Sequence, residues 1–168
     1  HVSDLLINCI TLDYENSEKK KRDYHDEMEF VCKHEKRNKY IRDLAIGCKE
    51  TTLVLFNYQE HGELLHKMIS ENTDRPVFLV HGNIDKVVRE EIRQYAIANK
   101  DSIIVASYGT FSTGITIPNL YNIIFASPFK SMIRNLQSIG RSIGKFEDKI
   151  ATIYDISDNL MKGEKPNH

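Results

Sequence analysis

Gln137, Gly140 and Arg141 lie in the short segment Gln-Ser-Ile-Gly-Arg-Ser, whose residue types suit contact with a phosphate group. An arginine guanidinium is planar and permanently charged, and its fork of N–H donors matches phosphate oxygens. Gly140 lets the backbone come close to whatever Arg141 contacts. The segment follows the apolar run 121–126, so an arginine in a helical turn after a strand is predicted. These features predict phosphate chemistry.

The sequence does not encode a complete phosphate site, because it contains no Gly-x-x-x-x-Gly-Lys-[Ser/Thr] loop. Such a loop cradles a triphosphate with backbone N–H groups and a lysine. We therefore expect Arg141 to reach a triphosphate that another part of a larger protein holds.

Composition indicates a globular domain of ordinary size, with 168 residues, of which 40% are apolar and 28% are charged. The net charge of −1 does not indicate a nucleic-acid binder, so any such site must come from local clustering. No apolar run approaches the roughly 18 residues that span a bilayer, and no signal peptide opens the chain. The first residue, His1, suggests a cut inside a longer protein. We expect a cytoplasmic protein without membrane partners.

The cysteines and histidines are scattered rather than clustered. Cys9, Cys32 and Cys48 form no disulfide framework and no zinc pair, and we expect small buried side chains in a reducing cytosol. His61 and His66 are five residues apart and would not share a helix face, so no metal site is predicted.

Hydrophobic periodicity predicts an α/β fold. Strands are expected over 5–12, 52–56, 76–80, 102–106, 121–126 and 150–154. Helices are expected on either side of a break near His34, with Gly47 near the second helix's end, and over 59–71, 84–98 and 131–142. Such alternation favours a mostly parallel sheet with helices on both faces. In the helix over 59–71, Leu64, Leu65, Met68 and Ile69 share one side. In the helix over 84–98, the residues expected to face inward are Val88, Ile92, Tyr95 and Ala96.

Ligands in such sheets bind beyond the carboxyl ends of the strands, which directs attention to the loops there. These loops are polar and often contain glycine. They comprise 57–59, 81–83, 107–110, 127–130 and Asp155.

Three segments in order, 53–57, 106–118 and 137–141, resemble motifs IV, V and VI of superfamily 2 helicases. His81-Gly82 with Arg89 resembles motif IVa. The resemblance covers the second RecA-like domain, which implies a three-layer fold. Within the superfamily, the phrase Val-Ala-Ser-Tyr-Gly-x-Phe-Ser-Thr-Gly-Ile is closest to phage recombination helicases. The implied domains are 1–50, linking from a missing first domain, 51–156, the RecA-like domain, and 157–168, a frayed or truncated tail.

The resemblance implies that ATP with Mg²⁺ lies between two RecA-like domains and is held mainly by the first. Arg141, with Gln137, would be the catalytic contribution of the second domain, because a positioned arginine stabilises phosphoryl transfer by roughly 10³–10⁵ in rate. The residues expected near the nucleotide are Gly114, Thr116, Gly140 and Lys145. The sequence departs from the family at Gly144, where a second arginine is usual, and at Thr116, where aspartate is frequent.

The same resemblance places nucleic-acid contacts on the loops after the strands. Short hydroxyls and backbone N–H groups there suit the phosphate backbone and do not read base sequence. The expected residues are Asn57, Tyr58, His81, Gly82, Ser107, Tyr108, Thr110 and Thr113. Asn57 could equally cap the next helix, and Arg89 with Arg93 could be a basic patch or a solvated face. The basic residues of the first third favour a solvated helix surface over a DNA contact; they are the run 19–22 with Lys33, Lys36, Arg37, Lys39 and Arg42.

Three functional hypotheses remain. The first is the C-terminal half of an ATP-dependent DNA helicase that acts on recombination or stalled-fork intermediates, with the N-terminal RecA-like domain as its partner. The second is a catalytically impaired nucleic-acid-binding module of the same fold, which Gly144 favours. The third is an unrelated doubly wound domain, but the ligand loop this would need after the first strand is absent.

Overall fold

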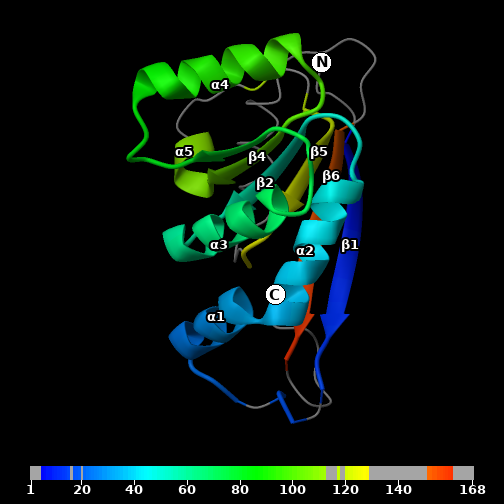
Figure 1. Cartoon of the computed structure of the whole chain (residues 1–168). Helices are drawn as coiled ribbons and strands as arrows, with labels where there is room; N and C mark the ends of the chain where they lie inside the picture. The colour runs from blue at the N-terminus through cyan, green and yellow to red at the C-terminus, as the bar shows by residue number, and fades with distance from the viewer. Residues whose placement is uncertain are drawn as a thin grey trace.

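The computed structural model describes residues 5–15, 17–19, 21–112, 117, 120–128 and 151–160. In this part of the chain the elements follow one another as shown in Figure 1. They are β1 (Leu5–Asp13), α1 (Tyr24–Lys33), α2 (Glu35–Gly47), β2 (Thr52–Phe56), α3 (Gln59–Ser70), β3 (Val77–Val80), α4 (Lys86–Ala98), β4 (Ile103–Ser107), α5 (Tyr108–Ser112), β5 (Asn122–Phe125) and β6 (Ala151–Asn159).

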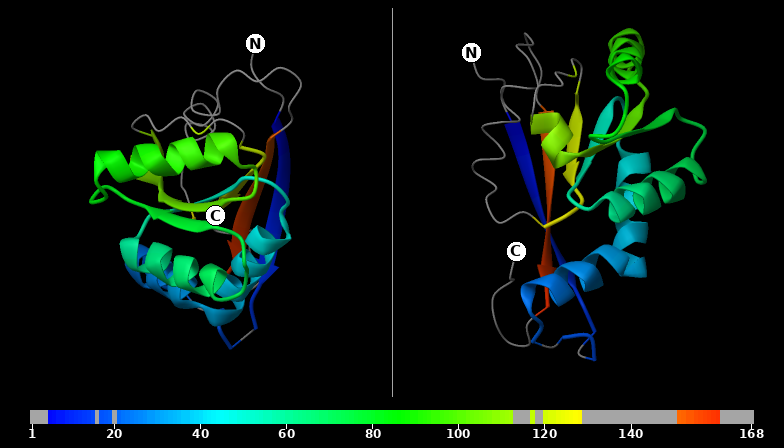
Figure 2. Two further views of the ribbon diagram at one scale, coloured as in Figure 1. Left: turned by 45° about the horizontal axis from the view of Figure 1, so that its top comes forward. Right: turned by 90° about the vertical axis from the view of Figure 1, so that its left-hand side faces the viewer.

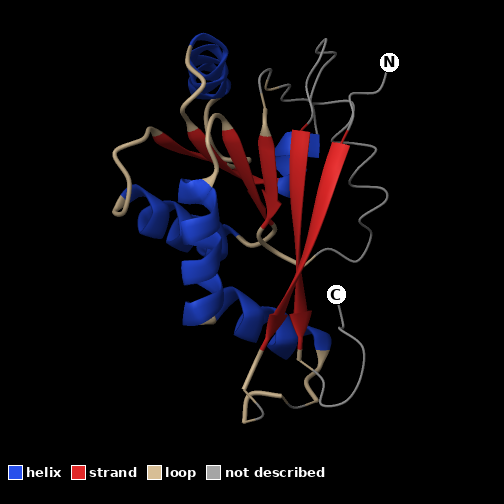
Figure 3. Cartoon of the chain, turned by 90° about the vertical axis from the view of Figure 1, so that its right-hand side faces the viewer, coloured by secondary structure: helices blue, strands red, loops and turns tan. Residues whose placement is uncertain are grey.

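The described strands form one parallel sheet of six strands in the order β1-β6-β5-β2-β4-β3. Figure 3 shows the long pair β1 and β6 at one edge of the sheet. β2 lies between β5 and β4, and every residue of it is buried. A continuous apolar run is what a strand covered on both faces requires.

Helices cover the two faces of this sheet and give three layers (Figure 2). Successive side chains of a strand point to opposite faces, so β2 contributes to two separate cores. Val54 and Phe56 pack with Ile41 and Ala45 of α2 and with Leu65 and Ile69 of α3. Leu53 and Leu55 pack with Ile92 and Ala96 of α4 and with Phe111 of α5.

A third, smaller core places α1 against the carboxyl ends of β1 and β6. Val31 of α1 packs with Tyr14, which directly follows β1, and with Leu160, which directly follows β6. In Figure 1, α1 lies beside the tips of these two strands. α1 therefore covers part of the edge where the strands end.

Polar side chains fix where three helices begin. Asp23 accepts a hydrogen bond from the N–H of Asp26 at 2.8 Å, and Asp85 accepts one from Val87 at 2.7 Å. His34 ends α1 and begins α2, where its Nδ1 accepts from the N–H of Arg37 at 3.2 Å. Each cap satisfies a backbone donor that the helix itself leaves unpaired.

The predicted α/β architecture with a parallel sheet and helices on both faces is confirmed. The break between the first two helices falls at His34, and Gly47 is the last residue of α2. The predicted helix 131–142 lies outside the described residues. Among the described residues, no helix is both long and apolar enough to span a bilayer.

Four local predictions are wrong. β6 continues to Asn159, so Asp155 is inside a strand and not in a loop after it. Residues 108–112 form the short helix α5 rather than a loop. Val88 is 43% exposed, so it does not belong to the core of the described part. Cys9 is exposed because β1 is an edge strand, whereas Cys32 and Cys48 are buried as expected.

The division of the chain at residue 50 stays a prediction. β1 nevertheless pairs with β6 along nine residues, from Leu5–Ala151 to Asp13–Asn159. α2 shares a core with α3 and β2. The first fifty residues therefore contribute an edge strand and a covering helix to the same sheet as the rest.

Gly62 allows α3 to approach β2 closely, because a Cβ at this position would overlap the buried Phe56 ring. We expect Gly62→Ala to lower the free energy of unfolding by about 1–2 kcal/mol, since overpacking outweighs the gain in helix propensity. Urea denaturation measures the change.

Gly47→Ala is the matched control, because no atom lies within 4 Å of a Cβ added there. We expect it to leave stability unchanged or to raise it by about 0.5 kcal/mol. Equal effects of the two substitutions would contradict the packing argument.

Candidate functional site

The parallel register brings the ends of four strands to one edge of the sheet. Phe56 of β2 pairs with Ser107 of β4, and Val80 of β3 pairs with Ala106. Asn57 and His81, the residues that follow β2 and β3, therefore lie at the same level of the sheet as the start of α5. The end of β5 joins this edge directly, because the N–H of Asn57 donates to Ser127 Oγ at 3.0 Å.

Asn57 and Tyr58 form the connection from β2 to α3, and both are exposed. Tyr58 is the N-cap residue of α3, so the alternative in which Asn57 caps this helix does not hold. The Tyr58 side chain makes no capping hydrogen bond. Both side chains are therefore accessible at the edge, as contact with a nucleic-acid strand requires.

His81 and Gly82 form a turn that Arg89 holds in place. Arg89 Nε donates to the carbonyl of Ile84 at 3.0 Å, and its Nη2 donates to the carbonyl of Gly82 at 3.2 Å. His81 Nδ1 accepts from the N–H of Asn83 at 3.3 Å. Arg93 pairs with Glu90 at 3.1 Å. Arg89 thus stabilises the loop, which favours a structural role over a basic patch.

Ser107 and Thr110 satisfy one another at the start of α5. Their hydroxyl oxygens are 2.6 Å apart, and the N–H of Thr110 also donates to Ser107 Oγ at 3.3 Å. Thr110 is only 6% exposed, and Tyr108 is partly buried against the core. The role of these residues in nucleic-acid binding stays a prediction.

Several predicted site residues lie outside the described part of the chain. They are Thr113, Gly114, Thr116, Gln137, Gly140, Arg141 and Lys145, together with Gly144. Their roles remain the predictions made from the sequence.

A buried ion pair, which the sequence did not single out, lies next to this edge. Arg37 of α2 donates through Nε to Asp158 Oδ1 at 2.8 Å and through Nη2 to Oδ2 at 3.2 Å. Both side chains have no exposed surface. Arg37 Nη1 also donates to the carbonyl of Ala126, and the Tyr14 hydroxyl donates to Asp158. Burial, and then the Asp158 charge, raises the pKa of Tyr14, which therefore stays protonated.

His61 of α3 is the second polar group that lies deep beneath the edge, at 2% exposure. Its Nε2 is 2.9 Å from Asn38 Oδ1, and its Nδ1 is 3.3 Å from Ser127 Oγ. Burial, and secondarily the Arg37 charge, lowers the pKa of His61 to about 3. The imidazole is neutral at physiological pH.

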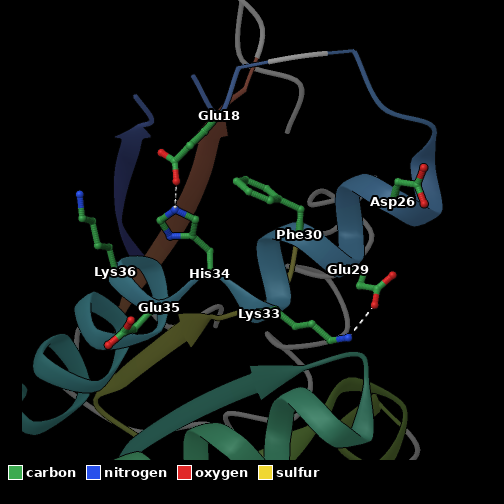
Figure 4. A pocket seen from close by; sticks show the side chains of 8 residues that line it. All are labelled: Glu18, Asp26, Glu29, Phe30, Lys33, His34, Glu35 and Lys36. Carbon is green, nitrogen blue, oxygen red and sulfur yellow. Dashed lines mark hydrogen bonds and ion pairs between the residues drawn. The ribbon is translucent and has the colours of Figure 1, made fainter. Parts of the chain in front are cut away.

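A cavity of about 620 Å³ lies between the loop after β1, α1 and the start of α2. Figure 4 shows Phe30 between the Glu18–His34 pair and the Glu29–Lys33 pair, whose contacts measure 2.8 and 2.6 Å. Asp26, Glu35 and Lys36 complete the lining. Four carboxylates against two lysines disfavour a phosphate here.

The basic residues of the first third are mostly paired with acids. Lys33 pairs with Glu29, Lys36 with Glu15, and Lys39 with Glu35. Arg22 lies over the Phe30 ring at 3.9 Å from its centroid. These surface contacts support the solvated-surface interpretation for the three lysines, whereas it is wrong for Arg37, whose side chain is fully buried.

A second groove, of about 460 Å³, opens between α1 and the start of α3. Met28 and Cys32 of α1 face Tyr58, His61 and Leu64 across it. Glu29, Lys33, Glu60 and His25 form the rest of the lining. Tyr58, predicted to contact nucleic acid, is therefore also a wall of this groove.

Comparisons with known proteins identify the family of this chain. Residues 35–143 match the helicase conserved C-terminal domain, which is more than half of the chain. The chain belongs to this helicase family. It is 38% identical over 172 residues to the ATP-dependent DNA helicase uvsW of Enterobacteria phage T4, covering 98% of the chain and 34% of that helicase. The expected resemblance to superfamily 2 helicases and to the T-even phage protein UvsW is confirmed.

Solved structures of the family show the same architecture. The crystal structure of T4 UvsW matches all of the chain with a TM-score of 0.84 and 36% identity, and the chain covers 35% of it. The yeast DEAD-box splicing factor Prp28 matches 95% of the chain with a TM-score of 0.63 and 18% identity, and the chain covers 31% of it. The second match shows the shared fold alone. The helicase chain thus spans about a third of the length of these relatives.

The buried pair predicts a large effect when one partner is removed. We expect Arg37→Met to lower the free energy of unfolding by about 3–5 kcal/mol, because Asp158 is left as an uncompensated buried charge. The double variant Arg37→Met/Asp158→Leu should recover most of the loss. Chemical denaturation of both variants measures this.

Lys36→Met is the control, because Lys36 pairs with Glu15 at the surface. It should leave stability unchanged within error. A double variant no more stable than Arg37→Met would contradict the account.

His61 predicts a pH-dependent loss of stability. Its pKa is about 6.5 when unfolded and about 3 when folded, so between these values the unfolded chain binds more protons. The stability contributed by neutral His61 is complete above about pH 6.5 and is lost as the pH falls towards about 3, which amounts to about 2 kcal/mol at pH 5. Comparing the unfolding free energies of the wild type and His61→Gln at pH 7.5 and pH 5 isolates this residue. Identical pH dependence in the two proteins would show that His61 titrates normally.

Proposed function

We propose that this chain is the C-terminal RecA-like half of an ATP-dependent DNA helicase or translocase that acts on recombination or stalled-fork intermediates. The observation that carries the proposal is 38% identity to an ATP-dependent DNA helicase along almost the whole chain. Its partners would be the N-terminal RecA-like domain of the same protein and the DNA backbone, single-stranded or branched. If the source is a phage, the helicase would act in the host cytoplasm.

In this proposal ATP and Mg²⁺ are held mainly by the N-terminal domain. The described residues fit such a division, because the Ser107 and Thr110 hydroxyls bond each other and the larger cavity is lined by carboxylates. The carboxylates outnumber the lysines of that cavity, so neither place favours a triphosphate. Arg141 and Gln137 would supply the charge and the amide that face the γ-phosphate, and Gly114, Thr116, Gly140 and Lys145 would border the nucleotide.

The exposed loops at the carboxyl edge would contact the DNA backbone. Asn57 and Tyr58 are accessible there, and the turn at His81 and Gly82 is held in place by Arg89. Ser107, Tyr108, Thr110 and Thr113 belong to the same proposed track. Contacts to phosphates, rather than bases, make binding independent of sequence and weaker at high salt.

The second candidate is a nucleic-acid-binding module of the same fold with impaired catalysis. Gly144 favours it, because the family usually has a second arginine there and Lys145 offers a point charge one position away. ATP hydrolysis distinguishes the two candidates.

The decisive experiment uses this chain joined to its N-terminal domain. We expect DNA-stimulated ATP hydrolysis, and we expect Arg141→Ala to reduce kcat by about 10³, because transition-state charge on the phosphoryl oxygens loses its partner. Steady-state ATPase assays with and without DNA measure both quantities.

Lys145→Ala serves as the matched control and should reduce kcat by less than about tenfold. The isolated 168-residue chain should hydrolyse no ATP, since it lacks a phosphate-binding loop. Unchanged activity in Arg141→Ala would rule out its catalytic role. A protein that binds DNA and hydrolyses no ATP would support the impaired module instead.

A further inference from the structure

A chain of hydrogen bonds beneath the carboxyl edge connects four segments of the fold. The N–H of Asn57 donates to Ser127 Oγ at 3.0 Å, and Ser127 Oγ is 3.3 Å from His61 Nδ1. His61 Nε2 is 2.9 Å from Asn38 Oδ1, and Asn38 Nδ2 donates to the carbonyl of Cys32 at 2.8 Å. The chain thus runs from the β2–α3 loop, through the end of β5 and α3, to α2 and the last turn of α1.

The chemistry of these groups allows one direction for every proton. Asn38 uses its amide N–H for Cys32, so its oxygen faces His61 and can only accept. His61 must then carry its hydrogen on Nε2 and leave Nδ1 as an acceptor for the Ser127 hydroxyl. A lone pair of Ser127 remains for the N–H of Asn57. Each member is satisfied when His61 is neutral.

The three side chains of this hydrogen-bond network are buried, so a missing member leaves its neighbours with little access to water. Ser127 is 1% exposed, His61 is 2% exposed and Asn38 is 1% exposed. In such surroundings, an unpaired donor or acceptor retains its full desolvation cost. The position of each group therefore constrains the next.

The hydrogen-bond network ends at the exposed loop of Asn57 and Tyr58. No side chain of that loop caps α3, so the Ser127 hydroxyl is the side-chain group seen to hold its backbone. We propose that Ser127, His61 and Asn38 are positioning residues that hold Asn57 and Tyr58 in the conformation that contacts the DNA strand. This inference rests on the proposed helicase function and adds residues that do not themselves touch DNA.

The first test is Ser127→Ala in the whole two-domain protein. The DNA concentration for half-maximal ATPase activity should rise about tenfold, which corresponds to about 1.4 kcal/mol of binding free energy, while kcat at saturating DNA should change less than about twofold. The probe is a forked oligonucleotide duplex. An unchanged half-saturating concentration, or an equal loss in kcat, would overturn the inference.

Ser102→Ala is the matched control for the loss of a buried hydroxyl. Ser102 is also fully buried, but its hydroxyl has no hydrogen-bond partner among the described residues. It precedes β4, at the opposite end of that strand from the candidate site. Its half-saturating DNA concentration should equal that of the wild type, and a shift as large as that of Ser127→Ala would sink the proposal.

The second test, Asn38→Asp, uses pH and remains decisive if Ser127→Ala does not fold. A carboxylate against Nε2 favours protonated His61, whose Nδ1–H then donates to Ser127 Oγ. This donor competes with the N–H of Asn57 for the same oxygen, and the buried Ser127 O–H loses its acceptor. The groups around His61 that also carry charge or titrate are Arg37 of α2, Cys32, His25, Glu29 and Lys33 of α1, and Tyr58 and Glu60 at the start of α3.

The quantity compared is the half-saturating DNA concentration of Asn38→Asp divided by that of the wild type. When the pH is lowered from about 8 to about 6, this ratio should rise at least threefold. A purely structural defect would raise this concentration by the same factor at every pH. A ratio that does not change with pH would therefore refute the positioning role of Ser127, His61 and Asn38. A wild-type protein without DNA-stimulated ATPase activity would instead refute the proposed function, and this inference with it. If the wild type shows DNA-stimulated ATPase activity and Ser127→Ala has the same half-saturating DNA concentration, the positioning role alone is refuted.

Discussion

The ion pair between Arg37 and Asp158 connects four segments of the fold in its fully buried interior. Both groups are fully buried, so neither charge can be exposed to water without moving an element of the core. The guanidinium also binds the carbonyl of Ala126, and the carboxylate accepts from Tyr14. α2, β6, the end of β5 and the residue after β1 are therefore fixed relative to one another at the edge that carries the candidate site.

The polar interior beneath this edge contrasts with its exposed loops. Arg37, Asp158, His61 and Asn38 complete their hydrogen bonds with protein groups, so they support the edge and are not available to a ligand. The exposed groups belong to short loops. Such loops suit contact with a phosphate backbone, which is the same whatever the base sequence. The proposed function requires such a division of roles, with a domain that contacts DNA through exposed loops while a neighbouring domain holds most of the ATP.

The types of the elements and the parallel arrangement of the sheet could be predicted, because the strands are continuous apolar runs separated by helices with clear periodicity. Part of the buried network was also within reach. His61 is four residues before Leu65 and eight before Ile69, on the face of α3 that is buried. The partner of Arg37 could not be predicted. Asp158 is 121 residues away, and the alternation of buried and exposed residues in β6 gives no indication of the pair. Motif order identified the family, whereas local spacing could not show that residues 108–112 continue into a helical turn.

The pairing of β1 with β6 has a consequence for the birth of this domain. Leu6 pairs with Thr152, so the first strand leaves the ribosome long before its neighbour exists. Contacts so distant along the chain form slowly, and an unpaired apolar strand invites wrong partners meanwhile. The β1 edge of the sheet can therefore form only after β6 has been translated.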